Sequence, residues 1–235
     1  MEEIRSGTIL PGVREDIELH TSDGLTLVGE LALPAESAPA VTLITLHPLP
    51  THGGFMDSHI LRKAANRLPA MISAAVLRFN TRGTTSPRGT SQGSFDGGVG
   101  EAADVAAAIK FCADRGLPKP WLVGWSFGTE LAIKYGPDHD ILGAILLSPP
   151  LHRATQQDLA RWNDFDRPLL ALVPELDEFL PPAEAAAGFA IVPKAQVIAF
   201  PDEKHLWVGE RATRSVLDQI AEITVPGSAP LPTSF

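Results

Sequence analysis

The sequence predicts an α/β fold with a mostly parallel, eight-stranded sheet flanked by helices on both faces. Two observations support this prediction. Short apolar runs of strand length recur along the chain, and stretches with helical periodicity separate them. Alternating strands and helices form a parallel sheet whose right-handed crossovers place helices on both faces. A length of 235 residues with 44% hydrophobic and 20% charged residues is ordinary for a globular protein with a sizeable core.

The chain begins with a polar segment, residues 1–16, which we expect to be a lead-in to the fold. Residues 17–20 and 25–33 then alternate apolar and polar side chains on either side of Ser22-Asp23-Gly24. Alternation around an Asp-Gly turn predicts an antiparallel hairpin with one face exposed to water.

The next run, Val41–Leu46, is almost continuously apolar, as expected for a strand that is buried on both faces. The other predicted strands are residues 74–79, 121–123, 141–147, 168–173 and 197–200. The predicted helices are residues 58–68, 100–115, 129–135, 156–163, 183–188 and 210–223. Because no linker or internal repeat interrupts this series, we expect residues 1–235 to form a single domain. Residues 225–235 contain three prolines and a Gly-Ser pair, which predicts an extended tail.

Composition excludes several classes of function. The net charge of −9, without a basic stripe, argues against nucleic-acid binding. The single cysteine, Cys112, excludes an intrachain disulfide and is expected to be a buried residue of a helix. The sequence has no apolar run of transmembrane length and no signal-peptide pattern, so we expect a cytoplasmic protein. We predict no cofactor and no metal, and the oligomeric state stays open.

The pentapeptide Gly124-Trp125-Ser126-Phe127-Gly128 lies between the apolar run 121–123 and the helix expected from Thr129. A serine at such a junction sits on a sharp turn that lifts its hydroxyl out of the sheet, and the two glycines remove side chains that would collide there. The N–H groups that begin the helix point at any negative charge that develops nearby. We therefore predict that Ser126 is a nucleophile. The alternative is a Gly/Ser-rich loop without a catalytic role.

A serine hydroxyl needs a base to take its proton and an acid to orient that base. The loops 174–181 and 202–207 follow neighbouring strands and lie at the carboxyl edge of the sheet, where open α/β folds carry their sites. We predict His205 as the base and Asp177 as the orienting carboxylate. The alternatives for the acid are Glu175 and Glu178, whereas Asp202 is expected to lie too close to His205 in sequence to reach the outer imidazole nitrogen. His152 is the alternative base or, preferred, a pocket wall. His139 follows a helix on the opposite edge and is expected to be a solvated turn residue.

The oxyanion of a tetrahedral intermediate needs N–H donors. We expect one from Phe127, directly after the nucleophile, and the other from the loop after the third strand. In that loop Pro48 and Pro50 have no N–H, which leaves Leu49. His47 is interpreted as a structural hydrogen-bonding residue.

The predicted substrate pocket is open and largely apolar. Its predicted contact residues are Trp125, His52, Leu151, Phe179 and Trp207. Residues 148–167 are too few for a separate cap domain, although a helix carrying Trp162 could form a partial flap. Arg82 has two interpretations, a group that binds a substrate carboxylate and, preferred, a brace for the loops. Glu101 and Asp104 are expected only to complement the dipole of their helix.

In their order and spacing these motifs resemble the α/β-hydrolase superfamily, and within it the small lidless esterase and dienelactone-hydrolase-like branch. The segments that carry the resemblance are His47-Pro48 with Gly53-Gly54, Phe79-Asn80-Thr81-Arg82-Gly83, Gly124–Gly128, Leu176-Asp177-Glu178 and His205-Leu206-Trp207. Two positions depart from it. Pro48 stands where many members have glycine, and Ser126 stands where dienelactone hydrolases proper carry cysteine.

The resemblance implies a serine hydrolase that cleaves carboxylic esters of short to medium acyl chains through an acyl-enzyme, with a small-molecule substrate. The same residues also fit a thioesterase or a peptidase. A third hypothesis is a non-catalytic member of the fold that binds an acyl ligand or a partner protein.

Overall fold

The structure is a computed structural model and describes residues 3–235. It contains an eight-stranded sheet with the strand order β1-β2-β4-β3-β7-β8-β9-β10. These strands are β1 (Val13–His20), β2 (Thr26–Leu33), β3 (Val41–Leu46), β4 (Ala74–Phe79), β7 (Pro120–Trp125), β8 (Gly143–Leu147), β9 (Leu169–Pro174) and β10 (Gln196–Phe200). The pairs β1–β2 and β2–β4 are antiparallel, and all other neighbours in this sheet are parallel. The predicted fold class is confirmed.

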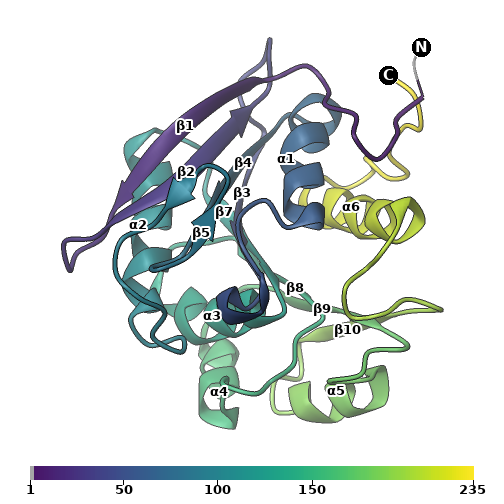
Figure 1. Cartoon of the computed structure of the whole chain (residues 1–235). Coiled ribbons are helices and arrows are strands. Elements are labelled where there is room, and N and C mark those ends of the chain that lie inside the picture. Colours follow the sequence, from purple (N-terminus) through teal and green to yellow (C-terminus); the bar gives the residue numbers. More distant parts are fainter. Residues whose placement is uncertain (1–2) are drawn as a thin grey trace.

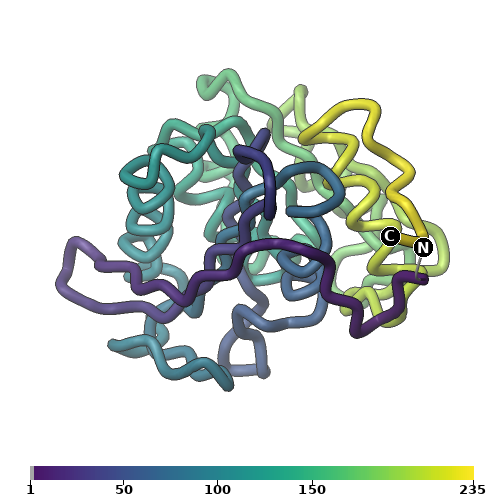
Figure 2. The backbone as a smooth tube through the Cα atoms, turned by 90° about the horizontal axis from the view of Figure 1, so that it is seen from above, coloured from purple at the N-terminus to yellow at the C-terminus, as the bar shows by residue number. Residues whose placement is uncertain are grey.

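The helices form a layer on each face of the sheet. They are α1 (His59–Ile72), α2 (Glu101–Asp114), α3 (Phe127–Tyr135), α4 (Gln156–Asp164), α5 (Pro182–Phe189) and α6 (Glu210–Thr224). Helices α1 and α6 cover one face, and α2, α3, α4 and α5 cover the other (Figures 1 and 2). Each face has its own apolar core, because the side chains of the central strands alternate between the two layers.

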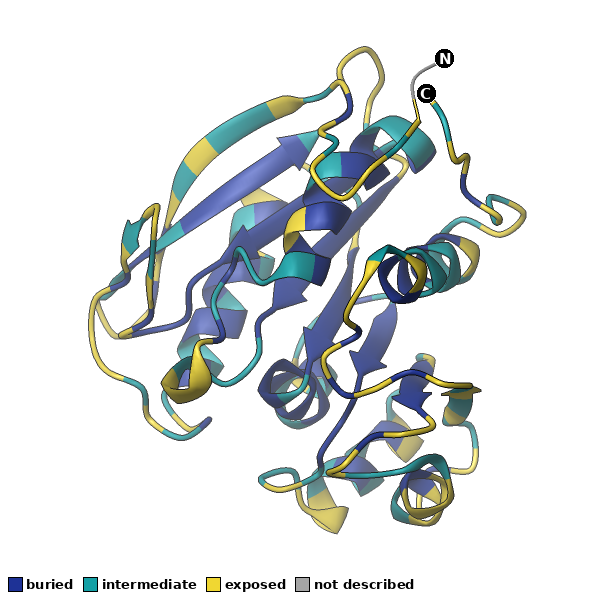
Figure 3. Cartoon of the chain, turned by 45° about the vertical axis from the view of Figure 1, so that its right-hand side comes forward, coloured by how far each residue is buried: buried dark blue, intermediate teal, exposed yellow. Residues whose placement is uncertain are grey.

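Burial along the strands explains the two sequence patterns. The central strands β3, β4, β7, β8 and β9 are buried over their whole length, whereas β1 at the edge alternates between exposed and less exposed residues (Figure 3). Strand β1 starts at Val13, four residues earlier than predicted, because Val13 to Asp16 pair with Leu33 to Glu30. Three of these four residues, Arg14, Glu15 and Asp16, are polar, which fits an edge strand with one wet face.

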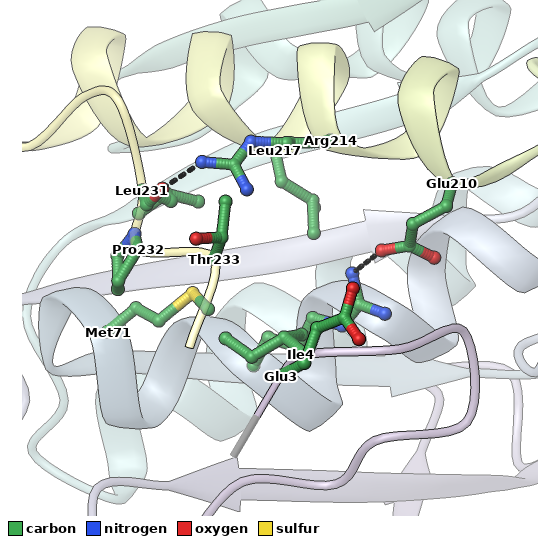
Figure 4. Close-up of a pocket in the computed structure, with 10 residues that line it drawn as sticks. Glu3, Ile4, Met71, Glu210, Arg214, Leu217, Leu231, Pro232 and Thr233 are labelled. Carbon is green, nitrogen blue, oxygen red and sulfur yellow. Dashed lines mark hydrogen bonds and ion pairs between the residues drawn. The ribbon is translucent and has the colours of Figure 1, made fainter. Parts of the chain in front are cut away.

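The first part of the chain and its tail lie side by side (Figures 1 and 2). The Ile4 N–H donates to Thr233 O at 2.9 Å, and the Leu231 N–H donates to Asp218 Oδ1 on α6 at 2.9 Å. Figure 4 shows Leu231, Pro232 and Thr233 around a cavity of about 200 Å³ that α1 and α6 also line. The first two residues of the expected lead-in lie outside the described residues.

Two features between β4 and α3 were not in the predicted series. Strands β5 (Thr85–Ser86) and β6 (Gly89–Thr90) form a small antiparallel hairpin after β4. Helix α3 begins at Phe127, two residues before the predicted start, so that Ser126 itself is the N-cap residue.

Within residues 3–235, every helix is too short or too polar to cross a bilayer.

Candidate active site

Ser126 occupies a strained turn between β7 and α3, with φ 52° and ψ −116°. Residues other than glycine rarely adopt such a conformation, and it persists only where the surrounding structure enforces it. A Cβ atom on Gly124 would overlap with Gly128 O, and one on Gly128 would overlap with Leu46 O of β3. The two glycines therefore allow backbone contacts that no other residue permits, which is the physical role that the sequence pattern predicts for them.

The structure brings Ser126, His205 and Asp177 together at the carboxyl edge of the sheet. Ser126 Oγ lies 2.9 Å from His205 Nε2. His205 Nδ1 lies 2.9 Å from Asp177 Oδ2 and 3.0 Å from Asp177 Oδ1. An ionised carboxylate only accepts hydrogen bonds, so Nδ1 carries the imidazole proton and Nε2 is free to accept the proton of the Ser126 hydroxyl.

Asp177 is held as a carboxylate by its hydrogen bonds. Burial by itself would raise its pKa, but the hydrogen bond from His205 and those from the Phe179 and Leu180 N–H groups bring the pKa below its ordinary value. The other predicted acids do not take its place. Glu175 Oε2 instead accepts the N–H of Asp202 at 3.1 Å, which turns these two residues toward each other.

The backbone of His205 is held from the α1 and α6 side of the sheet. Its carbonyl accepts hydrogen bonds from the Ser148 hydroxyl at 3.1 Å and from Trp125 Nε1 at 3.2 Å. Trp207 Nε1 donates to Ser148 Oγ at 2.8 Å, and His59 Nε2 donates to Trp207 O at 3.1 Å. No sequence motif pointed to Ser148.

The prediction that Trp125 and Trp207 contact the substrate is wrong. Both side chains are buried in the core beneath α1 and α6, and neither lines the cavity at Ser126. Trp125 follows Trp121 and Val123 at intervals of two along β7, so the pleat directs it to the face opposite α3.

Ser126 and His205 open into a cavity of about 350 Å³. Two of the predicted contact residues, His52 and Phe179, line it. Leu151 does not, since its side chain packs toward Gly188 of α5 instead. Trp162 is not a flap either, because it is buried and its Nε1 donates to Ile133 O of α3 at 2.9 Å. The complete lining is Pro48, Leu49, His52, Ser126, Phe127, Glu130, Pro150, His152, Arg153, Phe179, His205 and Leu206.

Sequence reasoning missed Glu130, Pro150 and Arg153 in this lining. Glu130 lies four residues after Ser126 in helical sequence, and that spacing is the signal that could have placed it on the same side of α3. Pro150 and Arg153 lie in the loop after β8 and belong to no motif.

The two predicted oxyanion donors both border the cavity. The Phe127 N–H belongs to the first turn of α3, where N–H groups lack intrahelical acceptors. The Leu49 N–H has no hydrogen-bond acceptor within residues 3–235. The buried ring of His47 supports this loop. Its Nδ1 donates to Pro48 O at 2.7 Å, and its Nε2 accepts the Thr81 N–H at 3.0 Å.

Arg82 braces the loops, as the preferred interpretation states. It donates through its backbone N–H and its guanidinium to Asp104, at 2.8 to 3.0 Å, and through its guanidinium to Asp23, at 2.9 and 3.3 Å. The prediction that Asp104 and Glu101 only complement a helix dipole is wrong. Asp104 is the buried partner of Arg82, and Glu101 accepts the N–H groups of Asp96 and Gly98 at 2.9 and 2.8 Å.

The remaining reactive side chains singled out in the sequence lie outside the site. Cys112 is buried in α2, and burial raises the pKa of its thiol to about 12. His139 follows the short 3₁₀ turn η2 (Gly136–Asp138) and does not line the cavity at Ser126. Over the described residues, no group of three or more His, Cys, Asp or Glu side chains is placed to hold a metal ion.

Comparison with known proteins gives no matching family model. An uncharacterized protein of Rickettsia prowazekii is 31% identical over 129 residues, which are 54% of this chain. The matched part is 52% of that protein, so the chain spans about half the length of this curated relative.

Solved structures resemble the chain over nearly its whole length. A lidless α/β serine hydrolase from Xanthomonas campestris has a TM-score of 0.73 and 26% identity and covers 92% of this chain and 95% of its own. An α/β serine hydrolase homologue from Coxiella burnetii has a TM-score of 0.74 and 24% identity, over 89% and 96% of the two chains. A Pyrococcus furiosus esterase has a TM-score of 0.74 and 17% identity, over 92% and 96%. These neighbours confirm the resemblance to lidless α/β hydrolases and support a hydrolase of this fold.

Proposed function

We propose that this chain is a serine hydrolase that cleaves carboxylic esters of short to medium acyl chains through an acyl-enzyme intermediate. One observation carries the proposal. Ser126, His205 and Asp177 form a continuous chain of hydrogen bonds that ends at a cavity with apolar walls. Each group has the partner that its assigned role requires, and the tautomer of His205 is the one that removes a proton from the serine.

In the first half of the reaction, Ser126 Oγ attacks the carbonyl carbon of the ester while His205 Nε2 takes the hydroxyl proton. The Asp177 carboxylate stabilises the imidazolium that forms and stays ionised. The tetrahedral intermediate places its negative oxygen against the N–H groups of Phe127 and Leu49, and such a donor contributes about 3–4 kcal/mol in related chemistry. The ester C–O bond then breaks, and His205 gives its proton to the departing alcohol.

In the second half, water attacks the acyl group on Ser126 while His205 Nε2 takes a proton from that water. The acyl–oxygen bond breaks, His205 returns its proton to Ser126, and the carboxylic acid leaves. The same side chains serve both halves, so no cofactor is required. We propose that the chain acts as a single domain on a small-molecule substrate. We also propose that the protein is cytoplasmic.

The shape of the cavity supports the preference for short and medium chains. A volume of about 350 Å³ holds a small ester, and Leu49, Phe179 and Leu206 supply apolar surface beside Ser126. Phe179 and Leu206 are also exposed to solvent, which fits an open cleft without a cap. Thioesters and peptides can use the same residues, and a panel of matched substrates separates these activities.

The proposal is tested with p-nitrophenyl butyrate and a fluorophosphonate probe. We expect Ser126→Ala to lower kcat by about 10⁴-fold or more and to abolish covalent labelling. Ser94→Ala is the control, because Ser94 is exposed and lies outside the cavity. A Ser126→Ala protein that retains wild-type turnover, or a wild-type chain that the probe does not label, contradicts the proposal. Absence of labelling in the wild-type chain favours a non-catalytic acyl-binding protein.

A further inference from the structure

Arg153 is a cation on the wall of the cavity, in the loop after β8. The carbon of its guanidinium lies 5.6 Å from the ring centroid of Phe127, the residue that follows the nucleophile. Its Nη1 lies 3.5 Å from Glu130 Oε2, as an ion pair. Over residues 3–235 its guanidinium makes no hydrogen bond, although the group carries five N–H donors.

This unused capacity distinguishes Arg153 from the structural arginines of the chain. Arg82 divides its guanidinium between Asp104 and Asp23. Arg78 is likewise bonded to Glu30 and Asp57. A guanidinium that only fixed the fold would be expected to use its donors in the same way, whereas Arg153 keeps its donors available at the cavity.

Glu130 holds this arginine in place from behind. Its Oε1 accepts the backbone N–H groups of Arg153 and Ala154, which fixes the loop. Its Oε2 is buried and makes no hydrogen bond within the described residues. The side chain of Glu130 is 1% exposed and that of Arg153 is 35% exposed, so the cavity presents the cation and hides the carboxylate.

The other polar side chains on the cavity wall add no exposed negative charge beside Arg153. Glu130 is the one acidic residue among the described residues that line the cavity, and the exposed polar side chains there are His52 and His152. An Arg guanidinium matches the geometry of a carboxylate through two parallel hydrogen bonds.

From this arrangement we infer that Arg153 is a specificity-determining residue that binds a carboxylate carried by the ester substrate. The inference rests on the proposed esterase function and narrows it to esters that bear a second, ionised acid group. That group can belong to the acyl part, as in a half-ester of a dicarboxylic acid, or to the leaving group. Glu130 fixes the position of the guanidinium and also offsets part of its charge.

The experiment compares two matched pairs of esters. For the acyl side, p-nitrophenyl hydrogen glutarate is compared with p-nitrophenyl valerate, which has the same chain length without the charge. For the leaving-group side, 4-butyryloxybenzoate is compared with 4-butyryloxybenzamide. The readout is the ratio of kcat/KM for the acidic ester to kcat/KM for its neutral partner, in wild type and in each variant. The two esters of the second pair differ in the intrinsic reactivity of their leaving groups, and this difference cancels when the ratio of a variant is divided by that of the wild type.

We expect Arg153→Gln to lower the ratio by about 10–100-fold in one of the two pairs, the range for a hydrogen bond to a charged group. Glu130→Gln, which keeps an oxygen for the loop N–H groups, is expected to raise the same ratio by severalfold. Arg62→Gln makes an equal change in net charge at an exposed residue of α1 outside the cavity and is expected to keep the wild-type ratio.

Three outcomes overturn the inference. One is a wild-type enzyme that hydrolyses the neutral esters and whose ratio does not change in Arg153→Gln, in which case the esterase proposal stands alone. Another is a fall in the ratio that Arg62→Gln reproduces, since this makes the effect one of net charge. The third is hydrolysis of none of the four esters, which removes the esterase proposal together with the inference.

Discussion

The Ser148 hydroxyl at the end of β8 donates a hydrogen bond of 3.1 Å to the backbone carbonyl of His205. The same carbonyl accepts a bond from Trp125 at the end of β7, and Ser148 Oγ accepts one from Trp207. Ser148 and Trp207 both adopt a positive φ of 50°. Two strand ends thus hold the loop that carries the imidazole, and strained residues persist there because the contacts enforce them.

We predict that Ser148→Ala lowers kcat by about tenfold and changes KM little, since one buried hydrogen bond contributes about 0.5–1.5 kcal/mol and the Trp207 N–H is also left unpaired. The variant shifts the position of the imidazole without changing the cavity wall, so kcat is affected more than KM. Steady-state kinetics with p-nitrophenyl butyrate measure this split.

Trp125→Phe gives an independent test of the same arrangement, because it removes the other donor to His205 O and keeps an aromatic ring in the core. We expect it to lower kcat in the same way. Ser94→Ala again provides the control. If Ser148→Ala lowers the melting temperature and leaves kcat intact, then Ser148 stabilises the fold without positioning His205.

The buried ring of His47 should make stability depend on pH. Burial lowers its pKa from 6.5 to about 4, against the weaker, opposing effect of its hydrogen bond to Pro48 O. Between pH 6.5 and pH 4 the unfolded chain therefore binds a proton at this ring and the folded chain does not. Stability from this group is complete above pH 6.5 and falls as the pH drops toward 4, by up to about 3 kcal/mol.

Urea unfolding at several pH values between 7 and 4 measures this loss. His47→Asn is expected to be less stable at pH 7 and to lose less stability on acidification than the wild type. His20→Gln, at an exposed position of β1, is expected to follow the wild-type curve. A His47→Asn curve parallel to that of the wild type would show that another group causes the acid sensitivity.

The backbone contact between Gly128 and β3 should tolerate no side chain. A Cβ atom on Gly128 would overlap with the carbonyl group of Leu46 on β3, and Gly128 lies two residues after Ser126 in the first turn of α3. We predict that Gly128→Ala lowers the free energy of unfolding by about 3 kcal/mol or more, as overpacking and backbone strain in a core do.

Gly7→Ala is the matched control for this substitution. A Cβ atom there meets no atom within 4 Å, so its effect is expected to stay within about 0.5 kcal/mol. Urea unfolding of the two variants compares them directly, and equal stabilities would mean that α3 and β3 are not in close contact.

The sequence by itself determined the α/β class, the eight strands of the main sheet and the turn at Ser126. These features rest on local patterns. A strand buried on both faces needs a continuous apolar run, and the turn needs glycines at two fixed positions. Asp177 and His205 could be named because the carboxyl ends of parallel strands share one edge.

Only the tertiary structure decided which way individual side chains point. Trp125 adjoins Ser126 in sequence, yet the pleat of β7 directs its ring to the face of the sheet that α1 and α6 cover. There its Nε1 donates a hydrogen bond to the backbone carbonyl of His205. Arg153 and Glu130 lie 23 residues apart and meet at the cavity only because the loop after β8 folds over α3. Such pairings depend on the packing of distant elements and leave no periodic signal in the chain.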